Sequence, residues 1–451
     1  MSDLDLVVLG DIVLPSGVVT DGHVAVREGR IARVGCGPAP SAHDRIDARG
    51  CLVMPGAIDG QTHSRSQKGQ EDFIWSTRSA AAGGVTTIVD MPYDAGNLIC
   101  NAERLRTKAR EAGRQARVDY ALYGTIHPQE GPARIAEMVE AGACGFKFST
   151  FGTDPDRFPR IPPHVMHACF AEIAKHGLVA GVHNEDDEVV KALVRQMREQ
   201  GVTDYTAHTR SRPVYSETLA INQIYELAAS TGCRGHVVHC STARGYELCE
   251  AYRRQGYRTT IEACIHYLVL SEEDDVARLG GKAKVNPPIR GRNEREAIWR
   301  HLAAGQVDLV STDHVSWAED RKTLPNMLDN ASGATGLDAL QVLMLTGLKR
   351  RGLPLQLAAR VLAQGPARLF GLGQRKGALT EGCDADIAIL KPTRWTYDPA
   401  RHGNNFVSWS PYVGQLLEYQ VAATYLRGTL VFDGINVRAE PGFGKFVTPL
   451  S

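Results

Sequence analysis

A short stretch near the start of the chain carries three polar residues at alternating positions. Asp59, Gln61 and His63 follow the apolar run 51–54 and a Pro-Gly turn. Alternate side chains of an extended segment share one face, so these three groups would point the same way. A polar face directly after an apolar strand indicates a metal or catalytic site. A capped polar turn at a strand end would explain this stretch alone equally well.

The pattern of the chain beyond residue 52 predicts the scaffold that would hold such a site. Apolar, strand-like runs alternate with segments long enough for helices over roughly 320 residues, which predicts a (β/α)8 TIM barrel enlarged by loop insertions. An open doubly wound sheet is the alternative, but no G-x-G-x-x-G motif follows the first strand. The expected strands are 52–58, 86–90, 120–124, 145–148, 179–183, 236–239, 259–264 and 309–313, and the clearest helices are 101–113, 163–176, 216–230, 243–255 and 293–304.

Both ends of the chain have β character instead. Residues 4–54 contain short β-favouring runs punctuated by glycines, and β character returns after about residue 375. A hairpin is expected from 420–426 to 429–432, around Arg427 and Gly428. We therefore expect residues 1–54 and 376–451 to pair into one small composite β-sandwich beside a barrel domain of residues 55–375.

The predicted barrel gathers reactive side chains from distant parts of the chain. Active sites of such barrels lie at the carboxyl ends of the strands. His63 lies beyond the first expected strand, Lys147 in the fourth and His183 at the end of the fifth, while His239 and Asp313 end the sixth and the eighth. Histidines, a carboxylate and a lysine that can become an anionic derivative form a ligand set for zinc-like divalent metals. Each residue alone is more often structural, but the five together predict a metal centre.

Composition excludes several other classes of protein. The 51 Lys and Arg residues balance the 51 Asp and Glu residues, which argues against a general nucleic-acid or anionic-membrane binder. The acidic start of the chain has no signal-peptide pattern, and no run of about 18 apolar residues predicts a membrane span. The ten cysteines include no Cys-x-x-Cys pair, so we expect reduced thiols in a cytoplasmic protein.

Motifs along nearly the whole chain resemble the signature series of the cyclic amidohydrolases, which include allantoinase, dihydropyrimidinase (hydantoinase) and dihydroorotase. The motifs are D-x-Q-x-H from Asp59, G-F-K ending at Lys147, V-H ending at His183, H-V-V-H-C-S around His239 and S-T-D-H around Asp313. The segments E-A-C-I-H-Y-L from residue 262 and K-V-N-P-P-I-R from residue 284 belong to the same series. The order and spacing of these motifs together are highly specific.

The resemblance implies a centre of two divalent metal ions, with zinc as the expected metal. A carbamylated Lys147 would bridge the ions, because a carbamate offers two anionic oxygens. His183 and His239 would hold one ion, and His63 and Asp313 the other. A hydroxide between the metals would attack the ring amide, and Asp313 would move its proton to the leaving nitrogen.

One position departs from the family pattern. Gln61 stands where the family has the first histidine of D-x-H-x-H. An amide oxygen is a weaker zinc ligand than imidazole. We therefore expect the ion next to His63 to be held loosely, to be a harder ion or to be absent, so that one or two ions are bound.

The resemblance is closest to allantoinase, through the segments 77–92 and 408–414. Dihydropyrimidinases carry a tyrosine shortly after the bridging lysine, and this chain has none after Lys147. Arg65 stands where dihydroorotases place a carboxylate-binding arginine, although a loop-stabilising arginine is the equal alternative. Asn286 and the backbone after it would hold the substrate ring. A different ureide, hydantoin, imide, lactam or dihydropyrimidine remains open as the substrate, with hydantoinase-like or dihydroorotase-like specificity as the alternatives.

Two functions of different class follow from these observations. The first is a metal-dependent hydrolase that opens a small cyclic amide by cleaving a carbon–nitrogen bond. The second is a catalytically weak relative that keeps the fold as an assembly scaffold. Relatives are commonly tetramers, so we expect a homo-oligomer, either a tetramer or a dimer.

Overall fold

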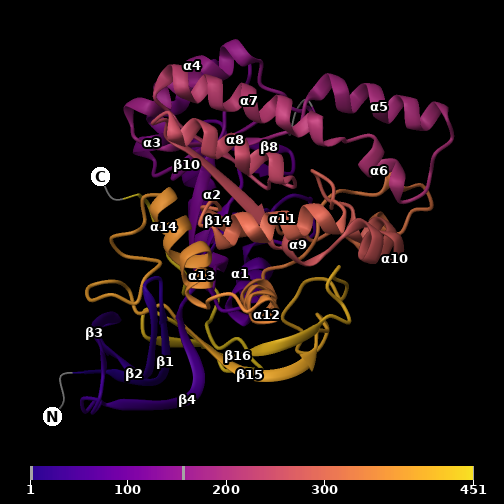
Figure 1. Cartoon of the computed structure of the whole chain (residues 1–451). Coiled ribbons are helices and arrows are strands. Elements are labelled where there is room, and N and C mark those ends of the chain that lie inside the picture. Colours follow the sequence, from indigo (N-terminus) through magenta and orange to yellow (C-terminus); the bar gives the residue numbers. More distant parts are fainter. Residues whose placement is uncertain (1–3, 155–157, 450–451) are drawn as a thin grey trace.

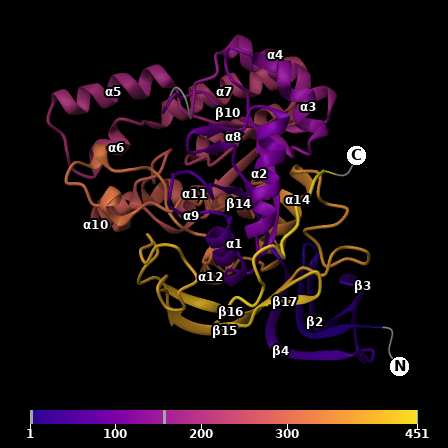
Figure 2. The same cartoon turned by 180° about the vertical axis from the view of Figure 1, so that it is seen from behind.

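The computed structural model of the chain describes residues 4–154 and 158–449. It contains an eight-stranded sheet, a seven-stranded sheet and a pair of short strands (Figures 1 and 2). We expect no export signal at the acidic start of the chain. The first three residues of this start lie outside the described residues. Among the described residues, no helix is both long enough and apolar enough to cross a membrane.

The eight-stranded sheet is a closed barrel, which confirms the predicted fold class. Its strands are parallel and follow the order β14-β13-β12-β11-β10-β9-β6-β5. The first and last strands meet because the His63 amide donates to the His314 carbonyl at 2.9 Å, next to a parallel bridge between Thr62 and His314. The strands are β5 (Ala57–Thr62), β6 (Val85–Asp90), β9 (Asp119–Gly124), β10 (Gly145–Ser149), β11 (Val179–His183), β12 (Arg234–Val237), β13 (Thr259–Cys264) and β14 (Leu309–Ser311).

The expected first strand, 52–58, is wrong as a single element. Residues up to Pro55 belong to β4 (Asp44–Pro55) of the other sheet, and the barrel strand β5 begins at Ala57. Gly56 lies between them, and a Cβ at this position would come within 2.3 Å of the Thr86 side chain. The chain thus passes from one sheet to the other at a point where only glycine fits.

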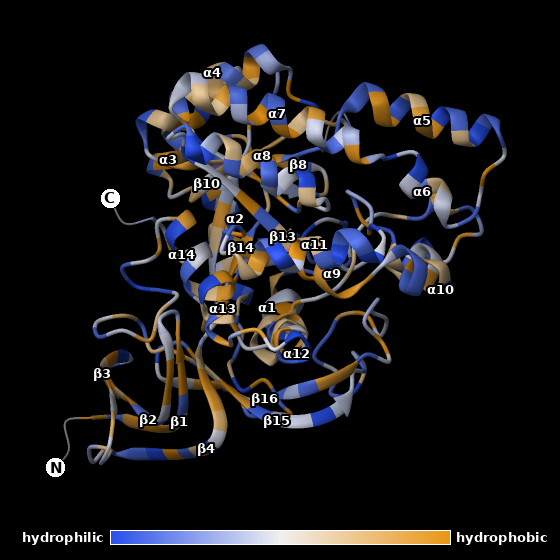
Figure 3. Cartoon of the chain, viewed as in Figure 1, coloured by the Kyte–Doolittle hydropathy of each residue, from blue (hydrophilic) through white to orange (hydrophobic). Residues whose placement is uncertain are grey.

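Helices surround the barrel, and the five clearest sequence predictions correspond to α2, α4, α7, α8 and α11 (Figure 1). In Figure 3 the helices α4, α7, α8 and α11 carry both hydrophobic and hydrophilic residues, as expected for helices that cover a core on one side. The α-helices are α1 (Phe73–Ala82), α2 (Ala102–Gln115), α3 (Ile135–Glu140), α4 (Pro163–Lys175), α5 (Asp187–Glu199), α6 (Thr206–Arg210), α7 (Val214–Thr231), α8 (Ala243–Arg254), α9 (Ile265–Val269), α10 (Ala277–Leu279), α11 (Arg292–Ala303), α12 (Leu340–Arg351), α13 (Gln356–Ala359) and α14 (Gly365–Leu369).

Local sequence explains where several of these helices begin. The side chains of Asp72, Asn101 and Asp186 accept hydrogen bonds from the first turns of α1, α2 and α5. Shorter helical turns and strands fill the loops. They are β7 (Tyr93–Asp94), β8 (Asn97–Leu98), η1 (Gly131–Arg134), η2 (Glu272–Val276), η3 (Gly280–Ala283), η4 (Glu319–Lys322), η5 (Met327–Asp329) and η6 (Arg360–Gln364).

The two ends of the chain pair with each other, as predicted. The seven-stranded sheet has the order β17-β16-β15-β4-β1-β2-β3, and β4 pairs in parallel with β1 and antiparallel with β15. The expected hairpin is confirmed, because β16 and β17 flank Arg427 and Gly428, both at positive φ. The domain boundaries at 54/55 and 375/376 stay predictions. The further strands are β1 (Leu6–Leu14), β2 (Gly17–Arg27), β3 (Arg30–Cys36), β15 (Ile387–Thr396), β16 (Leu416–Leu426) and β17 (Thr429–Phe432).

One buried lysine fastens this sheet to the barrel. The Lys376 ammonium lies 2.6 Å from a carboxylate oxygen of Asp119, at the start of barrel strand β9. It also lies 3.0 Å from Asp384 and 2.8 Å from Asp386, which directly precede β15. Arg427 of the hairpin turn donates to Asp119 as well. The four charged groups around Asp119 therefore connect the barrel with the start of β15 and with the turn between β16 and β17.

Replacing this lysine should weaken the whole fold. Lys376→Met removes the cation and leaves three carboxylates that are all buried in the native structure. Breaking a buried ion pair by removing one partner typically costs about 3–5 kcal/mol, and we expect a loss of that order in the free energy of unfolding. Urea denaturation followed by circular dichroism measures it. Lys391→Met, on the exposed part of β15, is the control and should leave the midpoint unchanged. An unchanged midpoint for Lys376→Met would contradict the fastening role.

Candidate metal centre

The five residues predicted from the strand ends gather at the carboxyl end of the barrel. His63 follows β5, Lys147 lies in β10 and His183 is the last residue of β11. His239 and Asp313, expected at strand ends, instead lie two residues beyond β12 and β14. Both have positive φ, 38° and 48°, a conformation that non-glycine residues seldom adopt and that is often found at functional sites.

His63 and Asp313 form one half of the candidate centre. The Nε2 atom of His63 lies 3.3 Å from Oδ1 of Asp313, and the Gln61 amide donates to the same oxygen at 2.8 Å. The side-chain carbonyl of Gln61 is buried and has no hydrogen-bond partner in the described structure. Burying a carbonyl oxygen without a hydrogen-bond donor costs free energy of folding. Such an oxygen can instead serve as a ligand for a hard cation.

His183 and His239 form the other half. Nδ1 of His183 lies 3.0 Å from Nε2 of His239, and the ring centroids are 4.7 Å apart. Burial lowers the pKa of both imidazoles, and the neighbouring Lys147 lowers both further. Neutral imidazole is the form that binds metals. Two facing nitrogens on neutral rings fit a cation between them.

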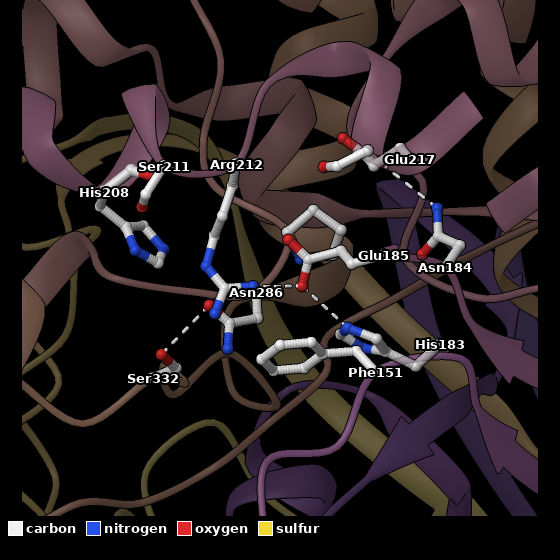
Figure 4. Close-up of polar contacts among 12 residues, drawn as sticks. Phe151, His183, Asn184, Glu185, His208, Ser211, Arg212, Glu217, Asn286 and Ser332 are labelled. Carbon is white, nitrogen blue, oxygen red and sulfur yellow. Dashed lines mark hydrogen bonds and ion pairs between the residues drawn. The ribbon is translucent and has the colours of Figure 1, made fainter. Parts of the chain in front are cut away.

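The outer nitrogen of His183 is held by a carboxylate that sequence reasoning missed (Figure 4). Nε2 of His183 lies 2.8 Å from Glu185, and Arg212 donates to the same oxygen at 2.5 Å. Burial opposes ionisation of Glu185, but Arg212 and His183 outweigh it and hold the pKa of the carboxyl below its usual range. With Nε2–H donating to an ionised Glu185, the lone pair of His183 lies on Nδ1, which faces His239. In the sequence, this partner is indicated only by an acidic residue two positions after His183.

Lys147 is buried between these halves. Its ammonium lies 5.6 Å from the ring centroid of Phe158, and it forms no ion pair within the described ranges. Burial lowers the pKa of Lys147 to about 8, although Asp313 and Glu262 act in the opposite direction. A larger fraction of the amine is therefore neutral than for an exposed lysine, and the neutral amine is the form that adds carbon dioxide.

The described side chains do not yet form a closed metal cage. In the parts of the chain that the structure describes, no three His, Cys, Asp or Glu residues converge as a group that could hold an ion. The candidate residues form two pairs, with Lys147 as a separate buried amine. The unpartnered Gln61 oxygen and the facing imidazoles of His183 and His239 nevertheless fit a divalent cation. A carbamate on Lys147 would add the anionic oxygens that the set now lacks.

A second missed residue, Glu262, supports the turn at His239. Its carboxylate accepts from the His239 amide at 3.2 Å and from the Ser311 hydroxyl at 2.8 Å. It also lies 3.3 Å from Nε2 of His236. The sequence indicates its role through its position inside an apolar strand-like run. A carboxylate in a buried strand needs hydrogen-bond partners. Glu262 thus links the loop after β12 to the end of β14.

His314 points away from the candidate centre, although it directly follows Asp313. Its Nε2 atom lies 2.8 Å from the buried Glu71, whereas Asp313 faces His63. Strand alternation does not explain this difference, because β14 ends at Ser311. The left-handed backbone at Asp313 separates the two side chains instead.

The two predicted substrate-binding residues lie in different surroundings. Arg65 donates at 2.6 Å to both Asp72 and Glu111 and lies over the ring of Phe73. These contacts favour the loop-stabilising alternative for Arg65, and its substrate role stays a prediction. The side-chain oxygen of Asn286 accepts from Ser332 at 3.2 Å, in the region that also holds Arg212 (Figure 4). Its role toward a substrate ring also stays a prediction.

Comparisons with known proteins place the chain among relatives of one kind. A family model described as "Amidohydrolase family" matches residues 52–431. The chain is 37% identical to an allantoinase of Rubrobacter xylanophilus, with 100% of this chain and 98% of the relative covered. It is 32% identical to an L-hydantoinase of Paenarthrobacter aurescens, with 98% of each covered. The solved L-hydantoinase (dihydropyrimidinase) from Arthrobacter aurescens has a TM-score of 0.94 at 32% identity, covering 99% of this chain and 100% of that chain.

Proposed function

Because the chain belongs to the amidohydrolase family, we propose that it opens a ureide ring of the allantoin type by metal-assisted hydrolysis. The chain is a hydrolase of cyclic amide carbon–nitrogen bonds and is allantoinase-like. The observation that carries the proposal is the pair of facing imidazoles, His183 and His239, beside the buried Lys147 and opposite Asp313. Allantoinases at 37% and 34% identity over almost the whole chain support the ureide as substrate.

The family implies dependence on a divalent metal. We propose that the metal is zinc and that Lys147 is carbamylated. His183 and His239 would hold one ion, and His63 with Asp313 the other, next to Gln61. A bound divalent ion supplies hydroxide at neutral pH and polarises the amide carbonyl. Glu185 fixes the tautomer of His183, so that Nδ1 is free to bind.

Asp313 carries the proton steps of the proposed reaction. Its carboxylate lies at the barrel mouth, within 3.3 Å of His63 and 2.8 Å of the Gln61 amide. We assign it to accept the proton of the attacking water and to deliver that proton to the leaving ring nitrogen. Asn286 and the backbone after it would orient the ring, and Arg65 is retained as a weaker candidate for an anionic substrate.

A hydantoin is the second candidate substrate. The L-hydantoinase relatives at 32% identity favour it, both in sequence and in structure. The segment after Lys147 contains Phe148 and Phe151 but no tyrosine. By resemblance, dihydropyrimidinases use a tyrosine there to polarise the substrate, so dihydropyrimidines fit less well. A catalytically weak scaffold protein would open none of these rings.

The proposed setting is a homo-oligomer, dimer or tetramer, in the cytoplasm. All ten cysteines of the chain are free thiols in the structure, and eight of them are buried. Such thiols suit a reducing compartment. The proposed partner is the small cyclic amide alone, without nucleic acid or membrane.

A substrate panel combined with Lys147→Ala tests the proposed function. The purified protein should open allantoin faster than hydantoin and dihydrouracil, and it should contain divalent metal by elemental analysis. Lys147→Ala should lose both metal and ring opening, because the bridging group is gone. Lys175→Ala, on the exposed side of α4, is the control and should keep both. Metal retained in full by Lys147→Ala would contradict its bridging role, and no turnover of any ring would favour the scaffold.

A further prediction concerns the metal affinity of the site next to Gln61. We expect the ion near His63 to be held more weakly than the ion between His183 and His239, because an amide oxygen is the poorer zinc ligand. Gln61→His should raise occupancy of the weaker site, measured as metal per chain after dialysis against graded chelator. Gln61→Leu is the control and should not raise it. Two equally tight zinc ions in the native protein would refute the prediction.

Another prediction concerns the proton transfer assigned to Asp313. Asp313→Asn keeps the shape and an oxygen acceptor for the Gln61 amide but cannot take a proton. Turnover should fall by at least about 100-fold, the lower end of the usual general acid–base contribution, while metal and substrate binding largely persist. The measurement is kcat with metal content on the same preparation, and Asp320→Asn on the exposed turn η4 is the control. Loss of metal in proportion to activity would leave Asp313 a ligand only.

A further inference from the structure

A cavity of about 420 Å³ lies at the end of the barrel opposite the candidate metal centre. Its wall includes Arg234 at the start of β12, Thr259 at the start of β13 and Asp308 just before β14. The helical segments η6 and α14 complete the wall. Strand starts mark the amino end of the barrel, whereas His63, His183, His239 and Asp313 lie at or beyond strand ends. The cavity is therefore separate from the site described above.

The wall of this cavity carries unbalanced positive charge. One carboxylate lines it, that of Asp308, which accepts from the Ile261 amide at 2.7 Å and is already paired with Arg253 outside the lining. Within the described ranges, none of the lining arginines forms an ion pair with a carboxylate. These arginines are Arg234, Arg258, Arg360 and Arg368.

The guanidinium groups line one cavity, and two of them, Arg234 and Arg258, affect one another. Arg234 is half-buried and donates to the Leu369 carbonyl at 3.3 Å. Burial lowers the pKa of Arg234, and the positive charge of Arg258 lowers it further. Arg360 reaches across to Gly305, where a Cβ would lie 3.2 Å from its guanidinium. Asp308 offsets only part of this charge, so an anion bound among the four arginines would reduce their repulsion.

We propose that this cavity binds a small organic anion that carries a phosphate group or a pair of carboxylates. Guanidinium groups bind such oxyanions bidentately, and four of them around one cavity match two or three negative charges. The volume suits a metabolite-sized ligand. A nucleic acid is disfavoured, because the chain as a whole carries no net charge. This binding site is independent of the proposed ring-opening function.

Calorimetry with inorganic phosphate and with succinate tests the proposal on the full-length protein. At least one of these anions should bind with a Kd below about 1 mM at low salt. The double variant Arg360→Gln, Arg368→Gln should bind it at least about tenfold more weakly, because hydrogen bonds to charged groups are lost. Both positions are exposed, so folding should persist. Arg106→Gln, an exposed arginine on α2, is the matched control and should bind as the native protein does.

Chemical modification locates the binding. Phenylglyoxal labelling read by peptide mass spectrometry should show that the bound anion protects Arg360 and Arg368 but not Arg106. The same readout separates the cavity from phosphate bound at the metal centre. Stronger binding of phosphate would assign a phosphorylated ligand, and stronger binding of succinate a dicarboxylate. Absence of binding by both anions, equal affinity in the double variant or protection absent from Arg360 and Arg368 would overturn the proposal.

Discussion

The arrangement of the candidate centre depends on one buried carboxylate, which joins the first barrel strand to the loop after the last one. Asp59 accepts from the Thr312 amide at 2.7 Å, from the Thr312 hydroxyl at 2.8 Å and from Thr62 at 2.5 Å. Burial raises the pKa of Asp59 to about 7, and the three hydrogen bonds act against that rise. They hold the loop after β14 against β5, which brings His63 and Gln61 next to Asp313.

Buried carboxylates with fixed partners recur around this end of the barrel. Glu185 is held by Arg212, and Glu217 by Arg290 at 2.5 Å and by the Ser241 amide at 3.1 Å. Glu262 contacts His236 in β12, the His239 amide after β12 and the Ser311 hydroxyl at the end of β14. Such groups are stable inside a protein only when their partners are in place. The end of β11 with His183 and the loop with His239 are therefore restricted to one arrangement, as a site that positions reacting atoms requires.

The two ends of the barrel differ in chemistry. The carboxyl end offers neutral imidazoles, a buried amine and a carboxylate, a combination suited to a divalent ion and to proton transfer. The amino end offers four arginines that have no carboxylate partner among residues 4–154 and 158–449, a combination suited to an anion. The same parallel strands separate these two environments, and the seven-stranded sheet is fastened beside them through Lys376. A fold of this kind can therefore carry a reaction at one end and a ligand at the other without shared residues.

The sequence by itself determined the barrel, the pairing of the chain ends and the five residues at the barrel mouth. Those features follow from local patterns, such as apolar runs of strand length, helical segments between them and the Arg427–Gly428 turn. Only the tertiary structure decided that the first run divides at Gly56 and that His239 and Asp313 adopt left-handed backbone. It also decided the partners of Glu185 and Arg65. The reason is physical, because contacts between residues far apart in the chain set these features and leave no periodic signal in the sequence.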